Sequence, residues 1–302
     1  MFPSKLINFS FLIQFLSETS SLSLNPVESF LLKKRLSKIQ NTVKNESFQS
    51  TSPLHPKTDN KSHNLILIFP GAGGPDAFTR ELETTISEIT KDTAPSPTIV
   101  STLDWGEFRG SLLTAAFDGE AFGESIGHVI WERFKIGGSS DDTSTLRSIH
   151  CIGISVGAFG GNACARTLCR TRSGSSRTGG GDTGPHVRLT LLDPFTSRGV
   201  WGTTYGQDNF GLDADFAEQY LNTDDPVPTT NDPLRLCSCV DVTGATERES
   251  FILPDGETMH CWPLVYFARY GYKKEGAILD NNVRLMYHGE GNVPEKGCIQ
   301  NL

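Results

Sequence analysis

The sequence predicts an α/β fold in which helices cover both faces of a mostly parallel central sheet. Leu65–Phe69 is a continuous apolar run of strand length, which is typical of a strand buried on both faces of such a sheet, and Val187–Leu192 is predicted to be another buried strand. Segments with helical periodicity separate these runs, and strands that alternate with helices imply right-handed parallel crossovers. Turns rich in glycine or aspartate follow several of the runs, which places polar groups at the carboxyl ends of the strands.

Strands and helices alternate along most of the chain. The predicted strands are Leu65–Phe69, Thr98–Leu103, Leu146–Ile154, Val187–Leu192, Phe216–Leu221 and Leu234–Val242. The predicted helices run from about Pro75 to Lys91, over a long region after Trp105 whose clearest amphipathic part is Ala121–Phe134, and over Ala158–Leu168. Residues 170–186 are too rich in glycine and serine to pack, and we predict a flexible insertion there. We therefore expect one domain over residues 63–302, which ends in a polar C-terminal tail.

The first 62 residues are predicted to lie outside this domain. Lys5 precedes the apolar stretch Leu6–Leu16, and a serine-rich sequence with a small-x-small site follows, so residues 1–23 are similar to a secretory signal. The alternative is a transit peptide for an organelle such as a plastid or mitochondrion, which the serines and the scarcity of acidic residues also fit. Residues 24–62 are polar and show no clear periodicity, which favours a disordered pro-segment or linker.

The charge and hydrophobicity of the chain narrow the classes of partner. A formal net charge of −8 disfavours a protein that binds nucleic-acid phosphates. No apolar run reaches the roughly 18–20 residues of a membrane-spanning helix. An acidic protein can still contact a lipid interface, because apolar lid segments rather than charged residues can bind the lipid surface.

The clearest chemical signal is a G-x-S-x-G motif formed by residues Gly153 to Gly157, with Ser155 at its centre. The motif follows the apolar strand Ile149–Ile154 and opens a helix rich in small residues, as in the nucleophile turn of α/β hydrolases. Such a sharp turn holds the serine in strained backbone geometry, and larger flanking side chains would collide with neighbouring elements. We therefore predict an α/β-hydrolase fold with Ser155 as nucleophile; the alternative is a Gly-rich structural turn.

A second Gly-rich turn, Pro70–Gly74, follows the first predicted strand. Backbone N–H groups in such a turn can point at a ligand oxygen, so we predict that the amides of Ala72 and Val156 form an oxyanion hole. A dinucleotide-binding turn is disfavoured because Asp76 stands where the third glycine of G-x-G-x-x-G belongs. A plain tight turn is the other alternative. The predicted chemistry needs no metal and no organic cofactor.

A nucleophilic serine needs a general base, and in this fold the order along the chain is serine, acid, histidine. Three histidines follow Ser155. His186 comes before the strand that would carry the acid, and His288 lies in the polar tail. His260 sits in a loop between the turn at residues 254–256 and an apolar segment, so we predict His260 as the base.

Two positions compete for the acid that orients this base. Asp193 ends the strand Val187–Leu192, and Pro194 stops that strand, so the Asp193 carboxylate is expected at the carboxyl edge of the sheet. Asp224 and Asp225 follow the next strand and offer the same geometry one strand further along the sheet. We favour Asp193 because it ends a buried strand more cleanly.

Six segments between about residues 64 and 272 resemble the pancreatic-type lipases in type and order. They are Phe69-Pro-Gly-Ala, Leu103-Asp104-Trp105, the G-x-S-x-G motif, Leu192-Asp193-Pro194, Asp213-Ala-Asp-Phe216 and the apolar segment after His260. The resemblance implies Ser155 as nucleophile, Asp193 as acid and His260 as base. It also implies an oxyanion hole from the amides of Ala72 and Val156. It covers the hydrolase core only, without the C-terminal β-sandwich of that family.

The expected function is that of a serine hydrolase that cleaves carboxylic esters of small molecules or lipids through an acyl-enzyme on Ser155. One alternative is a non-catalytic lipid-binding or storage protein on the same fold, since a fold alone does not grant a function. The other is a thioesterase with the same triad. Residues 196–212 form a Gly-rich loop with three aromatic residues, and we expect it to line or cover the acyl pocket rather than serve as a plain surface loop.

Overall fold

The computed structural model combines helices with an eight-stranded, mostly parallel sheet, which confirms the predicted α/β class. It describes residues 26–45, 48–54, 62–93, 96–108, 112–134, 145–176, 184–198, 204–225, 227, 230–272 and 296–302. The chain forms two compact units, Met1–Lys38 and Ile39–Leu302, and the sheet lies within the second. The predicted targeting segment at residues 1–23 lies outside the described residues.

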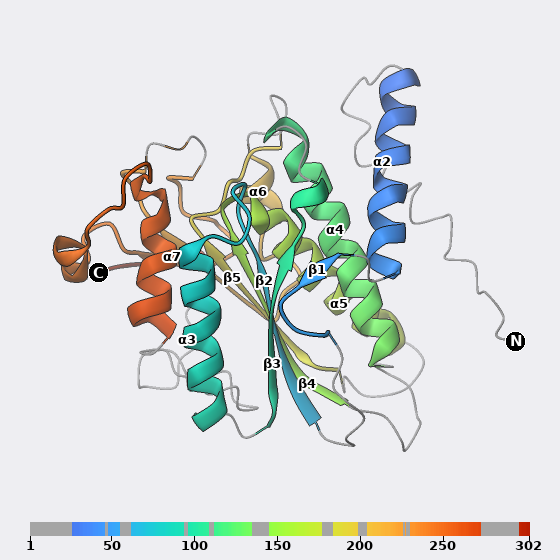
Figure 1. Ribbon diagram of the computed structural model, residues 1–302, viewed down its shortest axis with the longest axis horizontal. Helices are drawn as coiled ribbons and strands as arrows, with labels where there is room; N and C mark the ends of the chain where they lie inside the picture. Colours follow the sequence, from blue (N-terminus) through green and yellow to red (C-terminus); the bar gives the residue numbers. More distant parts are fainter. Residues whose placement is uncertain are drawn as a thin grey trace, which may run out of the picture. The chain divides into compact units, whose positions relative to one another are not determined.

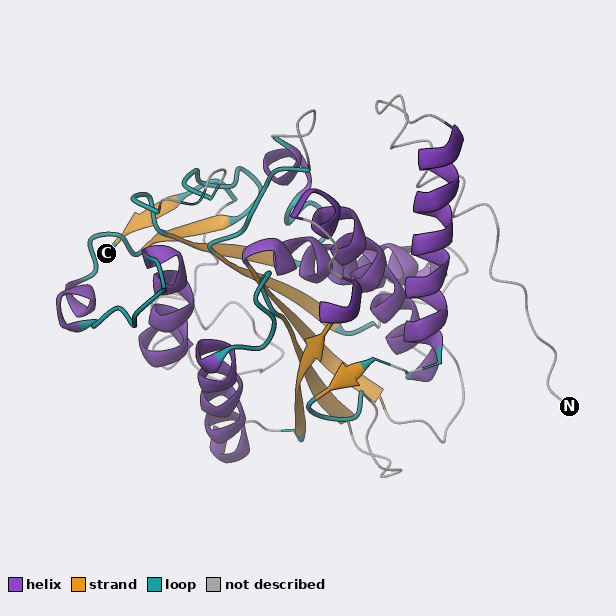
Figure 2. Ribbon diagram, turned by 45° about the horizontal axis from the view of Figure 1, so that its top comes forward, coloured by secondary structure: helices purple, strands orange, loops and turns teal. Residues whose placement is uncertain are grey.

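The sheet places the ends of its parallel strands side by side. Its strands are β1 (Gln49–Ser50), β2 (Ser62–Phe69), β3 (Thr98–Asp104), β4 (Thr145–Ile154), β5 (His186–Leu192), β6 (Phe216–Leu221), β7 (Ser238–Asp241) and β8 (Ile299–Asn301). They lie in the order β1-β3-β2-β4-β5-β6-β7-β8, and only the β1–β3 pair is antiparallel. Figure 2 shows the strong twist of this sheet. The loops that follow β2, β4, β5 and β6 therefore meet at one edge.

Helices cover both faces of the sheet. The helices of the described residues are α2 (Pro26–Lys44), α3 (Ala77–Thr93), α4 (Leu112–Arg133), α5 (Ala158–Ser176), α6 (Tyr205–Asn209) and α7 (Trp262–Tyr266), which continues as a π-helical turn over Phe267–Gly271. Helices α3 and α7 lie on one side of the sheet, and α4 and α5 lie on the other (Figure 1). Among the described residues, no helix combines the length and hydrophobicity needed to cross a membrane.

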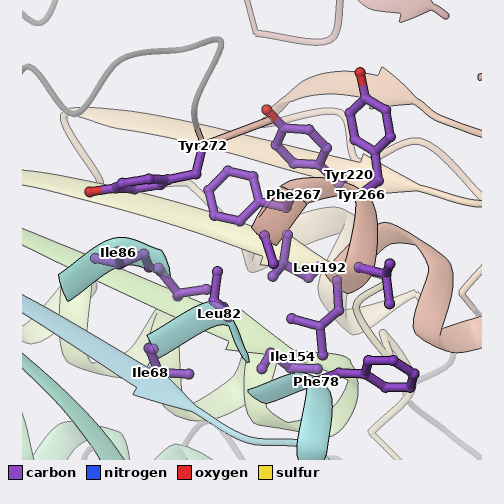
Figure 3. Packing of buried hydrophobic residues seen from close by; sticks show 14 of the residues in the cluster. Ile68, Phe78, Leu82, Ile86, Ile154, Leu192, Tyr220, Tyr266, Phe267 and Tyr272 are labelled. Carbon is purple, nitrogen blue, oxygen red and sulfur yellow. The ribbon is translucent and has the colours of Figure 1, made fainter. Parts of the chain in front are cut away.

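The alternation of side chains along β2 explains why both faces are covered. Ile66 and Ile68 join the apolar cluster under α3 and α7. Phe69 points to the opposite face, where its ring lies 6.3 Å from that of Phe122 in α4. Figure 3 shows the first cluster, in which residues of the strands meet residues of α3 and of the α7 region: Ile68, Ile154, Leu192, Tyr220, Phe78, Leu82, Ile86, Tyr266, Phe267 and Tyr272. This packing fixes α3 and α7 beside the loops that follow β2 and β6.

The prediction that residues 24–62 are disordered is wrong for two parts of that range. Helix α2 occupies Pro26–Lys44, and β1 occupies Gln49–Ser50. Proline at the first helical position suits a helix start. Leu36, Ile39 and Val43 recur at spacings of three and four residues and are buried, which is a helical pattern. The polar residues between them, such as Ser37, Lys38 and Asn41, hide this pattern in the sequence.

The predicted insertion at residues 170–186 is wrong for its first part, because α5 continues to Ser176. Arg170 pairs with Asp213 at 3.0 Å, and Arg172 pairs with Asp215 through both of its terminal nitrogens. These ion pairs join the last turns of α5 to the segment before β6, so tertiary contacts extend the helix beyond its apolar part. Residues 177–183 lie outside the described residues.

Two elements near the C-terminus differ from the prediction. Strand β7 spans only Ser238–Asp241 instead of Leu234–Val242, because Leu234 begins a turn. The Leu234 amide donates to the side chain of Gln219 at 2.8 Å and not to the backbone of a neighbouring strand. The expected polar tail contains an edge strand, since β8 pairs in parallel with β7. Its backbone hydrogen bonds, rather than apolar side chains, hold it in place.

Candidate active site

Ser155 stands at a sharp turn between β4 and α5. Its backbone φ is 51°, in the left-handed region that non-glycine residues rarely adopt. A Cβ on Gly157 would lie 2.1 Å from the carbonyl oxygen of Phe69, and one on Gly153 would lie 2.7 Å from the Cα of Ala158. Both flanking glycines are therefore required by backbone that cannot move aside. The turn stores strain to hold the Ser155 hydroxyl above the carboxyl end of the sheet.

His260 contacts the serine and two carboxyl groups. Its Nε2 lies 2.8 Å from the Ser155 Oγ. On the other side of the ring, Nδ1 lies 2.9 Å from Oδ2 of Asp193 and 2.6 Å from Oδ2 of Asp225. The histidine sits in a single 3₁₀ turn, Met259–Cys261, directly before α7. Residues that lie far apart in the sequence thus form one continuous hydrogen-bond network around His260.

Asp193 follows β5 directly and is almost completely buried, with 1% of its surface exposed. Its φ of 45° turns the chain away from the strand, and its amide donates to the carbonyl of Tyr220 at 2.9 Å. The Oδ1 atom accepts a hydrogen bond from the Asn222 amide at 3.2 Å. The Asn222 side chain donates to the carbonyl of Met259 at 3.0 Å. Asn222 therefore ties the acid loop to the turn that carries His260.

Asp225 reaches the same imidazole from the loop after β6. Its Oδ2 accepts from the Thr230 hydroxyl at 2.7 Å, and its Oδ1 accepts from the Val227 amide at 3.0 Å. Asp224, which the sequence offered on equal terms, instead pairs with Arg248 at 2.8 Å and is exposed. The structure therefore brings Asp225, but not Asp224, to the base.

The three titratable groups shift one another's pKa values in different directions. Burial lowers the pKa of His260, but hydrogen bonds and charge from Asp193 and Asp225 outweigh burial and raise it to about 9. Burial raises the pKa of Asp193 to about 7, despite its bond to His260. Burial also favours the neutral form of Asp225, but hydrogen bonds from His260, Thr230 and the Val227 amide lower its pKa to about 2.

The Gly-rich turn after β2 lies against the serine. A Cβ on Gly71 would lie 3.3 Å from the Cβ of Ser155. The Trp105 indole donates to the carbonyl of Pro70 at 2.9 Å, and this hydrogen bond is buried. Ala72 is exposed in this turn, whereas Val156 is buried at the start of the helical turn after the serine. The two segments predicted to donate amides therefore lie beside the same serine.

Asp76, which breaks the dinucleotide-binding pattern, has a local role. Its Oδ1 accepts from the amide of Thr79 at 2.7 Å, as an N-cap of α3 does. The aspartate therefore starts the helix in place of the glycine that a pyrophosphate would need.

The structure describes His186 and part of the loop at residues 196–212. His186 begins β5 and pairs with Ser148, so it stands at the amino end of the sheet. His288 lies outside the described residues, as does Trp201 of the loop. Phe210 is fully buried and its ring lies 5.0 Å from that of Phe159 in α5. Phe210 thus packs in the core, where it does not cover the site.

Asp193, Asp225 and His260 are also the one group of three, among the described residues, whose ligand atoms could share a cation. These atoms lie within 4.8 Å of one another. They are already joined by hydrogen bonds at Nδ1. A cation would have to displace the ring hydrogen that orients His260, so the arrangement suits proton transfer better than metal binding.

Sequence reasoning did not foresee two supporting groups, Asn222 and Thr230. Neither residue lies in a motif, and each acts through a loop whose path depends on the folded strands. One available signal was that aspartates follow two consecutive buried strands, because the carboxyl ends of neighbouring parallel strands lie side by side.

The fold and the site together define an α/β protein with a serine–histidine–aspartate arrangement at the carboxyl edge of its sheet. No known family model matches the chain, and no curated protein matches it in sequence. The geometry of the site is therefore the main evidence for the function.

Proposed function

We propose that the protein is an α/β-hydrolase-fold serine hydrolase that cleaves carboxylic esters, with lipid esters as the main substrate class. The observation that carries this proposal is the 2.8 Å contact between the Ser155 hydroxyl and Nε2 of His260, whose Nδ1 contacts carboxyl groups. The strained strand-to-helix turn at Ser155 supports it, because such a turn exposes a nucleophile. The resemblance of the motif order to pancreatic-type lipases favours lipid esters.

The proposed reaction is acyl transfer in two halves. The neutral form of His260, whose share grows as the pH rises toward its pKa of about 9, takes the hydroxyl proton at Nε2 while Oγ of Ser155 bonds to the ester carbonyl carbon. The amides of Ala72 and Val156 hold the oxyanion. His260 then gives its proton to the leaving alcohol as the ester C–O bond breaks. In the second half, His260 activates a water that attacks the acyl-enzyme and releases the carboxylic acid and free Ser155.

The alternatives make different demands on the site. A lipid-binding or storage protein has no use for a strained serine, whose backbone costs about 1–3 kcal/mol. The retained strain at Ser155 therefore favours catalysis. A thioesterase would use the same hydroxyl and the same base, so substrate preference separates it from an esterase. Secretion, or import into an organelle, stays a prediction from the sequence.

The proposal is tested by labelling with a fluorophosphonate probe, which reacts with activated serines. We expect wild-type protein to be labelled and the Ser155→Ala variant to stay unlabelled, since the variant lacks the hydroxyl that His260 activates. A matched control is Ser148→Ala, at the amino end of β4, which should be labelled like wild type. A series of p-nitrophenyl esters and thioesters then ranks the substrates. Equal labelling of wild type and Ser155→Ala would refute the nucleophile.

Trp105 provides a second prediction, because its indole is the buried donor to Pro70 in the proposed oxyanion turn. Trp105→Phe keeps an aromatic ring but leaves that carbonyl without its donor, at a cost of about 1–3 kcal/mol. We expect kcat for a p-nitrophenyl ester to fall roughly tenfold with KM little changed, because the turn would act mainly on the transition state. Near-UV circular dichroism checks that the fold is kept. Unchanged kcat would show that the hydrogen bond from Trp105 to Pro70 is not needed to position the turn.

A further inference from the structure

Two carboxyl groups contact a ring atom that carries at most one hydrogen. Asp193 and Asp225 both approach Nδ1 of His260, at 2.9 Å and 2.6 Å. A neutral imidazole that accepts the serine proton at Nε2 has its single hydrogen on Nδ1. Two ionised carboxylates so close together repel each other, so such a pair shares a proton. The two acids must therefore differ in their protonation.

The contacts around each carboxyl group indicate which acid is ionised. Asp225 accepts hydrogen bonds from the Thr230 hydroxyl and the Val227 amide in addition to His260, and these contacts involve both of its oxygens. Among the described residues, Asp193 accepts one hydrogen bond beyond its contacts with His260 and Asp225, a longer one of 3.2 Å from the Asn222 amide. A carboxylate that accepts more hydrogen bonds holds its negative charge more easily. The contacts favour charge on Asp225.

We propose that Asp225 is the ionised acid that orients His260, and that Asp193 holds the proton shared by the two carboxyl groups. The assignment rests on the proposed function in that His260 is taken as the general base. It differs from the motif order, which points to Asp193 as the acid. Asp225 is then the main positioning residue of the base, and Asp193 is a neutral hydrogen-bonding neighbour near and below neutral pH.

The charges around the pair agree with this assignment. Among the described residues, the titratable groups with the largest effect on each acid are His260 and the other acid, and Asp193 also acts on the neighbouring Cys261. Burial raises the pKa of the Cys261 thiol to about 12, so that thiol is neutral near pH 7. The pKa of Asp193 near 7 and that of Asp225 near 2 match a proton on the first acid. His260 thus faces one permanent negative charge.

The direct test is a pH titration of the aspartate carboxyl carbons by ¹³C NMR in the full-length protein, with Asp193→Asn and Asp225→Asn used for assignment. We expect Asp193 to take up its proton as the pH falls through about 7, while Asp225 stays ionised down to about pH 2. Wild-type spectra of two assigned signals decide the matter even if one variant does not fold. A titration in which Asp225 gains the proton first would overturn the assignment.

Kinetics supply a second measurement. Asparagine can imitate a protonated aspartic acid, so at pH 6, below the pKa of Asp193, Asp193→Asn should lower kcat/KM for a p-nitrophenyl ester only about tenfold, whereas Asp225→Asn should lower it by about 10³-fold. Asp224→Asn, next to the site but paired with Arg248, should match wild type. An equal or larger loss in Asp193→Asn would contradict the proposal. If no ester is hydrolysed, the proposed function fails, while the NMR titration still decides which acid is ionised.

Discussion

Replacement of His260 by alanine is expected to lower kcat for ester hydrolysis by about 10³-fold or more, with KM changed much less. The imidazole is the only group in contact with the Ser155 hydroxyl that can take its proton, among the residues that the structure describes. Without it, the hydroxyl must react from its protonated form, and the leaving alcohol receives no proton from the enzyme. The residual rate would come from the oxyanion hole and from binding.

The design of this experiment separates loss of the base from loss of structure. His186→Ala is the matched control, because His186 begins β5 at the other end of the sheet, and it should keep wild-type turnover. The double variant Ser155→Ala, His260→Ala should be no slower than either single variant, since residues that act as a unit give non-additive losses. Near-wild-type turnover of His260→Ala would exclude it as the base.

Gly123→Ala is expected to destabilise the fold by about 3 kcal/mol or more. A Cβ on Gly123 of α4 would lie 2.0 Å from the carbonyl oxygen of Gly160 in α5, and within 2.8 Å of two further backbone atoms of that residue. Backbone cannot rotate away as a side chain can, so the two helices would have to separate. Because α5 begins just after Ser155, the separation should also disturb the nucleophile turn.

Gly119→Ala, one turn earlier in the same helix, is the control for this change. Its Cβ would meet Trp105, Phe159 and Gly160 at 3.4 to 3.6 Å, which is ordinary contact. Alanine also favours a helix over glycine by about 0.5–1 kcal/mol, so Gly119→Ala should be neutral or stabilising. Urea unfolding followed by circular dichroism measures both variants. Equal free energies of unfolding for the two would show that the close crossing of α4 and α5 is not required.

Much of the fold followed from local patterns. The runs at Leu65–Phe69, Val187–Leu192 and Phe216–Leu221 lie within β2, β5 and β6, because strands buried on both faces are rich in apolar residues. The charged residues within the last two strands, Arg188 and Glu218, pair with each other. Helix α5 after the serine was also expected. Helix α2 was not, because its few buried residues are separated by polar ones. The extension of α5 to Ser176 depends on ion pairs with a distant segment, which periodicity does not show.

The sequence by itself determined the strand–turn–helix at Ser155, because the residues that form this turn are consecutive in the chain. Its flanking glycines are needed where the backbone of neighbouring elements comes close. It also narrowed the candidates for the general base to His260, and the candidates for the acid to Asp193 or the pair Asp224 and Asp225. Only the tertiary structure decided that Asp193 and Asp225 both reach Nδ1 of His260 while Asp224 turns to Arg248. That outcome depends on the loops after β5 and β6, whose side chains meet through folded neighbours such as Asn222 and Thr230 rather than through any spacing along the chain.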